Sequence, residues 1–324
     1  MTAGSPGFHQ GRSAPWEAEY HSPALAAEVV ALLRGAALVL DGTLGGGGHT
    51  AALLENGVGK VVGLDRDPEA LTAAGARLAD EAARGRFAAH QGNYAAIDAI
   101  PAIAELRFNG ILLDLGISSH QIDDAARGFS FREGAPLDMR MGGGADATQS
   151  AAVLLDTAPE DELARIFREY GDEPRAARLA REVVRRRGTR GFRTSDDLVG
   201  AIRGALGART GPSDFARLFQ SVRIAVNDEL GGLERALPAL RDRLAPGGTL
   251  AIIAYHSGED RLVKHAFRAW STDCICPPRL PMCACGGNHA LGETLTRRAL
   301  VASPDEVARN PRARSAKLRA WRAK

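Results

Sequence analysis

The chain has 324 residues, of which 45% are hydrophobic and 25% are charged, as is typical of a globular protein with a sizeable core. Its 41 basic residues against 39 acidic ones leave a net charge of +2, so total charge alone does not indicate a polyanionic partner. The apolar runs are shorter than the roughly 20 residues of a membrane span, and the first residues lack an export-signal pattern. We therefore expect a cytoplasmic protein without membrane contact.

The first 20 residues are expected to form a disordered arm, because Gly, Ser and Pro are frequent there. A helix should follow, with Ser22 as its N-cap and Pro23 at its first helical position. Strand-like and helix-like segments then alternate over residues 36–119, which predicts a parallel sheet with right-handed crossovers.

A glycine-rich loop over residues 42–48 follows the first predicted strand, which ends in Asp41, and precedes a helix-like pattern. This order is typical of a nucleotide-binding α/β unit. No lysine follows the glycines, so the loop is not a P-loop, and Thr50 stands where a dinucleotide fingerprint has its third glycine. A loop for S-adenosylmethionine (SAM) remains, because that ligand has no pyrophosphate to place on the helix.

The next strands also end in polar residues. Asp65 ends the second strand, where its carboxylate could accept ribose hydroxyls, and Tyr94 follows the third, where it could flank an adenine. Asp114 ends the fourth strand. Each aspartate could instead cap the next helix, but three of them beside a glycine loop argue for convergence on one ligand.

Beyond residue 119 the pattern is first irregular and then, from Ala147 to about Ala208, helical, and residues 126–214 are predicted to form an all-helical insertion. A helical stretch over 215–244 should break near Gly231-Gly232, and a fifth strand is expected over 249–255. Two closing antiparallel strands are expected at 295–301 and 316–322. The fold prediction is a Rossmann-like class I SAM-dependent methyltransferase sheet formed by residues 21–125 and 215–324.

All four cysteines lie in one short stretch, as Cys274, Cys276, Cys283 and Cys285. Without an export signal a disulfide framework is disfavoured. Structural zinc sites usually have two or more residues between paired cysteines, so the C-x-C pairs are weaker evidence for metal. The sequence favours a loop of reduced thiols, and no metal ligand is predicted.

Basic residues are concentrated in two segments. Residues 175–193 contain eight arginines and one acid, and Arg178 and Arg185 lie on one face of a predicted helix with an apolar back. A solvated helix face is the usual explanation, but acidic partners are nearly absent within this segment. With seven further basic residues in the tail from 309 to 324, the pattern favours binding to a phosphate backbone over an acidic protein surface.

The fourth strand has the polar end that methylation of an exocyclic amine requires. Asp114, Ser118 and Ser119 offer a carboxylate and two hydroxyls that can engage the N–H groups of the amine. No cysteine lies near this strand, which argues against covalent attack on a pyrimidine ring.

These residues are part of a wider resemblance, which covers nearly everything from His21 onward. The chain resembles the RsmH (MraW) family of bacterial 16S rRNA cytosine-N4 methyltransferases. The matching motifs are Asp41-Gly42-Thr43-Leu44-Gly45, Gly47-Gly48-His49, Asp65-Arg66-Asp67-Pro68, residues 112–119, Arg127-Gly128-Phe129-Ser130-Phe131, residues 136–141, Phe219-Gln220 with Arg223, Val226-Asn227 and residues 310–315.

The resemblance implies SAM as the cofactor and a cytidine in the P-site part of the decoding region of 16S rRNA in the small ribosomal subunit as the target. The SAM contacts that it implies are Gly47, Gly48, His49, Asp65, Tyr94, Asp114 and Gln121. Asp114, Ser118 and Ser119 are expected at the reaction centre, and RNA contacts are expected at Arg178, Arg185, His256 and Ser257.

Two other functions stay open at this stage. A SAM enzyme acting on a small molecule or a protein would not need the basic segments, and a non-catalytic RNA-binding factor would not need Asp65 and Asp114. The sequence leaves the oligomeric state open, with a homodimer among the alternatives.

Overall fold

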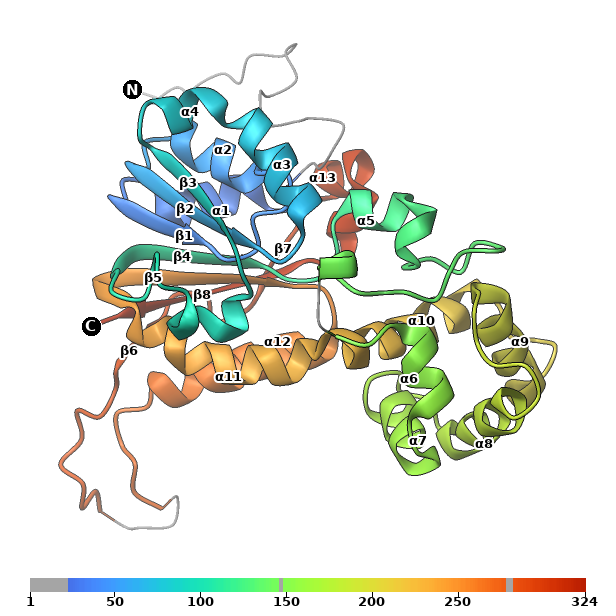
Figure 1. Cartoon of the computed structure of the whole chain (residues 1–324). Coiled ribbons are helices and arrows are strands. Elements are labelled where there is room, and N and C mark those ends of the chain that lie inside the picture. Colours follow the sequence, from blue (N-terminus) through green and yellow to red (C-terminus); the bar gives the residue numbers. More distant parts are fainter. Residues whose placement is uncertain (1–22, 146–147, 278–281) are drawn as a thin grey trace.

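The computed structural model describes residues 23–145, 148–277 and 282–324. Its centre is one eight-stranded sheet in the order β3-β2-β1-β4-β5-β8-β6, with β7 paired to β8. Neighbours among β3, β2, β1, β4 and β5 are parallel, and β8 is antiparallel to its partners (Figure 1). The strands are β1 Leu38–Asp41, β2 Lys60–Asp65, β3 Phe87–Gln91, β4 Phe108–Asp114, β5 Leu244–Ala254, β6 Gly292–Thr294, β7 Leu300–Val301 and β8 Lys317–Ala323.

The sheet is covered by helices on both faces (Figure 1). Successive strand residues point to opposite faces, so Val39 packs in one core and Leu40 in the other. Burial on both faces explains why the parallel strands are continuous apolar runs. The flanking elements are α1 Ala26–Leu33, α2 Gly48–Glu55, α3 Pro68–Arg77, α4 Ala79–Ala83, η1 Tyr94–Ala99, α11 Glu229–Asp242, α12 Ser257–Trp270, α13 Pro304–Arg309 and η4 Pro311–Ser315.

A second group of helices lies beside the sheet and has a core of its own (Figure 1). It comprises α6 Ala151–Thr157, α7 Glu160–Glu169, α8 Ala176–Arg187, α9 Ser195–Leu206 and α10 Pro212–Asn227. The short segments α5 Ser119–Asp123, η2 Ala125–Arg127 and η3 Gly143–Ala145 connect it to β4. Because Phe215 and Val226 of α10 pack in this core, we place the end of the helical unit after α10 rather than at residue 214.

Several predicted boundaries are wrong in detail. The first helix starts at Ala26 rather than Pro23. The break in the long helical stretch lies at Asp228, which has a left-handed φ of 50°, whereas Gly231 and Gly232 lie inside α11. Gly232 is small for a packing reason, since an added Cβ would lie 3.3 Å from Ala95.

At the C-terminus the expected last strand is confirmed as β8, but only Leu300–Val301 of the strand expected at 295–301 is a strand, and β6 ends just before that range. Two short strands, β6 and β7, instead pair with different parts of β8. The predicted arm over residues 1–20 and the N-cap Ser22 lie outside the described residues. None of the described helices has the length and apolarity that crossing a membrane requires.

Candidate functional site

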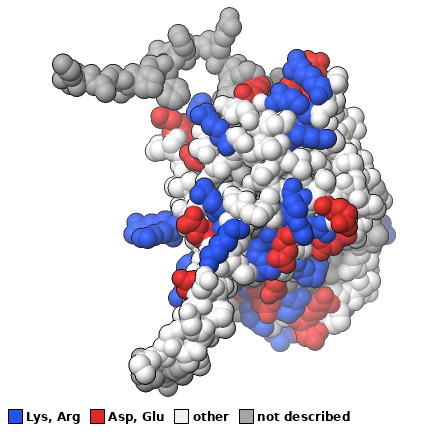
Figure 2. Space-filling view, turned by 90° about the vertical axis from the view of Figure 1, so that its left-hand side faces the viewer, with Lys and Arg blue, Asp and Glu red and all other residues white. Residues whose placement is uncertain are grey.

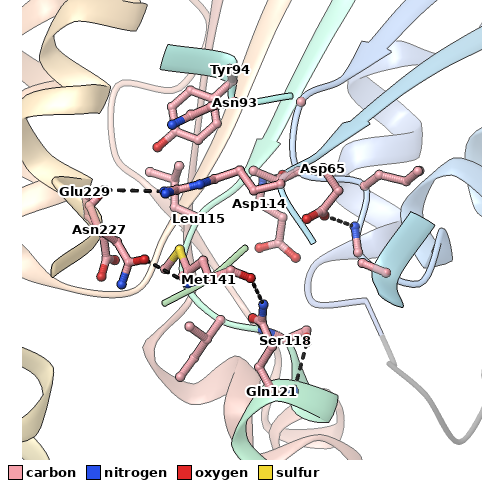
Figure 3. Close-up of a pocket in the computed structure, with 18 of the residues that line it drawn as sticks. Asp65, Asn93, Tyr94, Asp114, Leu115, Ser118, Gln121, Met141, Asn227 and Glu229 are labelled. Atoms are coloured by element: carbon pink, nitrogen blue, oxygen red, sulfur yellow. Dashed lines mark hydrogen bonds between the residues drawn. The ribbon is translucent and has the colours of Figure 1, made fainter. Parts of the chain in front are cut away.

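A cavity opens at the carboxyl edge of the sheet, beyond the ends of β1, β2 and β4 (Figure 3). The glycine loop forms one wall, and Asp65 and Asp114 come from the ends of β2 and β4. Asn93 and Tyr94 lie across the cavity from Ser118 and Gln121, while Asn227 comes from the end of α10. This is the edge at which open α/β sheets bind ligands.

The glycine loop is shaped by two backbone positions in the left-handed region. Gly45 has φ 51° and its N–H donates to Asp65 at 2.7 Å. Gly47 has φ 76° and packs against Ala74 and Leu78, so it supports the loop and is not among the lining residues, unlike Gly48. Side chains rarely adopt this conformation, which explains glycine at both positions.

Asp41 lies under the loop rather than in the cavity wall. It is 1% exposed and accepts hydrogen bonds from the Thr50 hydroxyl at 2.7 Å and the Thr43 N–H at 3.3 Å. Burial raises the pKa of Asp41 to about 6, an effect that nearby His49 opposes. The expectation that all three strand-end aspartates face the ligand is therefore wrong for Asp41, which holds the loop to α2.

Asp65 does line the cavity. Its two carboxylate oxygens accept from the N–H groups of Gly45, at 2.7 Å, and Asp67, at 2.9 Å. Burial raises its pKa, although these backbone donors counteract the shift. Each carboxylate oxygen has a further lone pair, so the group can still accept hydroxyl protons from a ligand.

Asp114 is held between two other side chains. The Tyr255 hydroxyl donates to its Oδ1 at 2.9 Å, and His49 Nδ1 lies 3.6 Å from its Oδ2. Burial raises the pKa of Tyr255, which keeps it protonated as a donor, and burial lowers the pKa of His49. Because His49 Nε2 lies 2.9 Å from the Ala24 carbonyl oxygen, that nitrogen carries the proton and Nδ1 faces Asp114.

Ser118 and Gln121 form the start of α5. The Ser118 hydroxyl accepts from the Gln121 N–H at 3.2 Å, and the Gln121 side chain accepts from the Ser118 N–H at 3.0 Å. This is a capping box, so Ser118 positions α5. Gln121 also donates to buried Asp67, and the side chain of Ser119 lies outside what the structure describes.

Acidic residues from the helical side complete the cavity, and sequence reasoning missed them. Asp228, Glu229 and Glu259 line it together with Tyr255. Burial opposes ionisation of Glu259, but His256, the Tyr255 N–H and Arg223 together outweigh burial and lower the pKa of Glu259. The strand-end rule could have identified Tyr255, which follows β5, whereas Glu229 reaches the cavity only through the packing of α11.

The charges of the wall restrict the ligand. Among the described residues that line the cavity, five are carboxylates and Arg66 is the one arginine or lysine, so the wall disfavours a pyrophosphate and favours a cation. The residues fit SAM, which carries a sulfonium and an ammonium group, and an acceptor for ribose is present in Asp65. Gly45 has open space where a side chain would begin, which leaves room for close approach.

The RNA-binding residues predicted from sequence have mixed placements. His256 caps α12 and its Nε2 lies 3.2 Å from Glu259, while Ser257 is exposed at the first position of that helix. On α8, Arg178 is exposed, but Arg185 makes two hydrogen bonds to Glu182 at 2.7 and 2.9 Å.

Two sequence inferences about charge are wrong. Several arginines of the 175–193 segment have acidic partners, because Glu173, Glu182 and Asp197 pair with them. The basic C-terminal segment is not a free tail, since β8 lies within the sheet and Arg319 pairs with Asp260 at 2.7 Å. Helical periodicity could not reveal Asp197, which lies on α9, or Asp260, which lies on α12.

The comparisons with known proteins agree with this geometry. The model of the MraW methylase family matches residues 18–324. The chain is 62% identical over 303 residues to the ribosomal RNA small subunit methyltransferase H of Gemmatimonas aurantiaca, covering 94% of this chain and 95% of that protein. It is 48% identical over 312 residues to the protein of the same name from Heliobacterium modesticaldum, covering 93% and 97%. A solved rRNA methylase from Streptococcus thermophilus is 11% identical, with a TM-score of 0.40 and coverage of 92% and 93%.

Proposed function

The chain belongs to the MraW methylase family, and on that premise we propose that it transfers the methyl group of SAM to N4 of a cytidine in 16S rRNA. The target would lie in the P-site part of the decoding region, with the small ribosomal subunit as partner. Support comes from the names of its relatives, which are ribosomal RNA small subunit methyltransferases, and from the acidic cavity beside the end of β4.

The cofactor would be held by the residues around the glycine loop. The backbone of Gly45, Gly46 and Gly48 allows close approach, and the Asp65 carboxylate would accept the ribose hydroxyls. Asn93 and Tyr94, which line the cavity, would contact the adenine. SAM supplies an electrophilic methyl group, and the acidic wall favours its positive charge.

Asp114 would act on the amine that receives the methyl group. The amine lone pair is delocalised into the pyrimidine, and a carboxylate that accepts an N–H hydrogen bond makes the nitrogen more nucleophilic. The Tyr255 hydroxyl holds this carboxylate through its hydrogen bond to Oδ1. The proton that the amine loses can pass to Asp114 or to water.

Of the other residues predicted for the site, Ser118 would act through α5, which carries Gln121, rather than on the amine itself. The helical unit, with the exposed Arg178 of α8, is proposed to hold the RNA backbone. The single observation that carries the function is the Asp114 carboxylate, which lines the cavity and accepts a hydrogen bond from the Tyr255 hydroxyl.

The test uses labelled SAM and small subunits from cells that lack this protein. The 16S rRNA is digested to nucleosides, which are separated and identified by mass spectrometry. We expect the label in N4-methylcytidine. Label in another nucleoside would show that this nucleoside, and not cytidine, accepts the methyl group. If label enters a ribosomal protein or nothing at all, the proposed function is wrong, and binding without transfer would favour an assembly factor.

A further inference from the structure

The loop that joins α12 to β6 brings all four cysteines of the chain together. Cys274, Cys276, Cys283 and Cys285 have sulfur atoms that all lie within 4.8 Å of one another. Three of the separations are shorter, at 3.6 Å for Cys274–Cys283, 3.5 Å for Cys283–Cys285 and 3.8 Å for Cys274–Cys285. The two C-x-C pairs therefore meet at one point.

These separations decide between two kinds of cysteine cluster. A disulfide needs sulfur atoms about 2.05 Å apart, so the four thiols are not bridged. Four sulfurs bound to one central Zn²⁺ at ~2.3 Å form a tetrahedron whose edges are about 3.8 Å. The three distances among Cys274, Cys283 and Cys285 match the edges of such a tetrahedron, and Cys276 Sγ lies within 4.8 Å of each of the other sulfurs.

A backbone donor also reaches one of the sulfurs. The N–H of Ala284 donates to Cys276 Sγ at 3.2 Å. Donors of this kind stabilise thiolates, the form in which cysteine binds metals. Hydrogen bonds of this kind to the ligand atoms are common around bound metals.

Within the described part of this loop, a few hydrogen bonds and no apolar core hold its shape. Its base is attached to the body where the Leu291 N–H donates to the Trp270 carbonyl at 2.8 Å. Beyond the base, Ile275 and Met282 are 65% and 81% exposed, so they provide no core. Figure 2 shows the loop standing out from the body as a largely uncharged projection. Segments too small for a core commonly rely on a bound metal.

We propose that Cys274, Cys276, Cys283 and Cys285 bind one structural zinc ion that orders this loop. In the sequence, the single residue between the cysteines of each pair was weak evidence for a zinc site, because typical zinc-binding pairs have longer spacers. Convergence of two pairs supplies the four ligands that a closed tetrahedral site requires. The site is independent of the methyl-transfer cavity, since none of the described residues that line the cavity belongs to the loop.

The test measures metal in the full chain, purified without a tag and without chelators under reducing conditions. We expect about one zinc and little iron per chain by elemental analysis, because a closed site of four cysteine thiolates binds zinc tightly. Replacing zinc by Co²⁺ should give the intense absorption bands of a tetrahedral thiolate site. In the variant carrying Cys274→Ser and Cys285→Ser, the zinc content per chain should fall at least about tenfold.

The matched control is Met282→Ser, which changes an exposed residue of the same loop to one that is not a ligand in structural zinc sites. It should keep its zinc. Circular dichroism of the Cys274→Ser/Cys285→Ser variant should keep the signal of the folded sheet, since the loop lies outside the core. Substoichiometric zinc in the unaltered chain, zinc retained by that variant, or disulfides found under these conditions would each overturn the proposal.

Discussion

Three aspartates at the ends of β1, β2 and β4 show how one residue type acquires different roles from its neighbours. Asp41 is covered by the loop and accepts from Thr50, so it shapes the backbone. Asp65 accepts two backbone N–H groups and still lines the cavity. Asp114 receives a phenolic donor from Tyr255. The chemistry we propose needs the last of these environments.

At Asp114 we predict that replacement by Asn reduces methyl transfer about 100-fold or more, because an uncharged amide favours the developing positive charge less. Tyr255→Phe should reduce the rate less, by roughly tenfold, since it removes one hydrogen bond to the carboxylate. Single-turnover transfer to small subunits measures both rates. Equal rates for the Asp114→Asn variant and the unaltered chain would remove Asp114 from the reaction centre.

At Asp41 the raised pKa, about 6, has a consequence for stability. The folded state binds this proton more tightly than the unfolded state, so the contribution is present below about pH 4 and is lost as the pH rises through about 6. Asp41→Asn removes this titration. We expect the free energy of unfolding of the variant, relative to the unaltered chain, to increase by about 2 kcal/mol between about pH 4.5 and pH 7.5.

Urea denaturation at the two pH values measures this difference, and Asp80→Asn serves as the control because Asp80 is exposed on α4. The comparison with the unaltered chain cancels the part of the His49 effect that does not depend on Asp41, since the lowered pKa of His49 makes acid destabilising in both proteins. If the free energy of unfolding of the Asp41→Asn variant, relative to the unaltered chain, stays constant or falls as the pH rises, the role of Asp41 is contradicted.

Among the elements, α8 presents the surface that we expect to meet RNA. Of the arginines on it, Arg178 and Arg181 are exposed and make no ion pair within the described part of the chain. Arg185 and Arg186 share Glu182, which holds the pKa of Glu182 at about 2. The unpaired arginines can approach a phosphate without first leaving an acidic partner.

We therefore predict that Arg178→Ala weakens RNA binding and reduces the slope of log K against log salt by about 0.7–0.9, the value for one phosphate contact. Arg185→Ala should change the slope less, because its side chain is already held by Glu182. Fluorescence anisotropy with a labelled 16S rRNA fragment over a range of salt measures both. Unaltered slopes in both variants would show that this face of α8 does not contact RNA.

Elements set by local pattern were predictable, and those set by distant contacts were not. The second strand was expected at residues 60–65, as in β2, because its apolar run is bounded by turn residues. The break at Asp228 was missed because a left-handed aspartate leaves no periodic signal, whereas two glycines do. The strand expected at 295–301 was wrong because β6 ends at Thr294 and β7 begins only at Leu300, and the two pair with different parts of β8.

The residues of the candidate site also fall into a group that local sequence predicts and a group that distant contacts determine. Asp65 and Asp114 follow from the strand-end rule, since their positions depend only on local sequence and sheet topology. Glu229 and Glu259 are brought to the cavity by α11 and α12, so only the packed structure places them there. The thiol cluster needed the loop to fold back before its two halves could be recognised as one site.

At the scale of the whole molecule, the cavity depends on how the segment at residues 139–141 is held between sheet and helices. Arg127 donates to Asp67 at 2.7 Å and to the Met141 carbonyl at 2.7 Å. From the other side, the Met141 N–H donates to Asn227 at 2.9 Å, and Asn227 donates to the Met139 carbonyl at 2.7 Å. The segment therefore connects the start of α3 to the end of α10.

The pair Arg127–Asp67 is buried, since the two side chains are 10% and 3% exposed. Removing one partner of such a pair leaves an uncompensated charge and typically costs about 3–5 kcal/mol, whereas removing both is far less harmful. Arg127→Met should therefore lower the free energy of unfolding by about 3 kcal/mol. The variant with both Asp67→Asn and Arg127→Met should recover a large part of that loss.

Urea denaturation of the two single variants and the double variant gives the coupling energy, and binding of SAM reports on the cavity. We expect the Arg127→Met variant to bind SAM more weakly, because Met141 lines the cavity and loses its contact with Arg127. Strictly additive losses in the double variant would mean that the two residues stabilise the protein independently. Unchanged SAM binding by the Arg127→Met variant would mean that other contacts, such as those of Asn227, suffice to hold Met141 against the sheet.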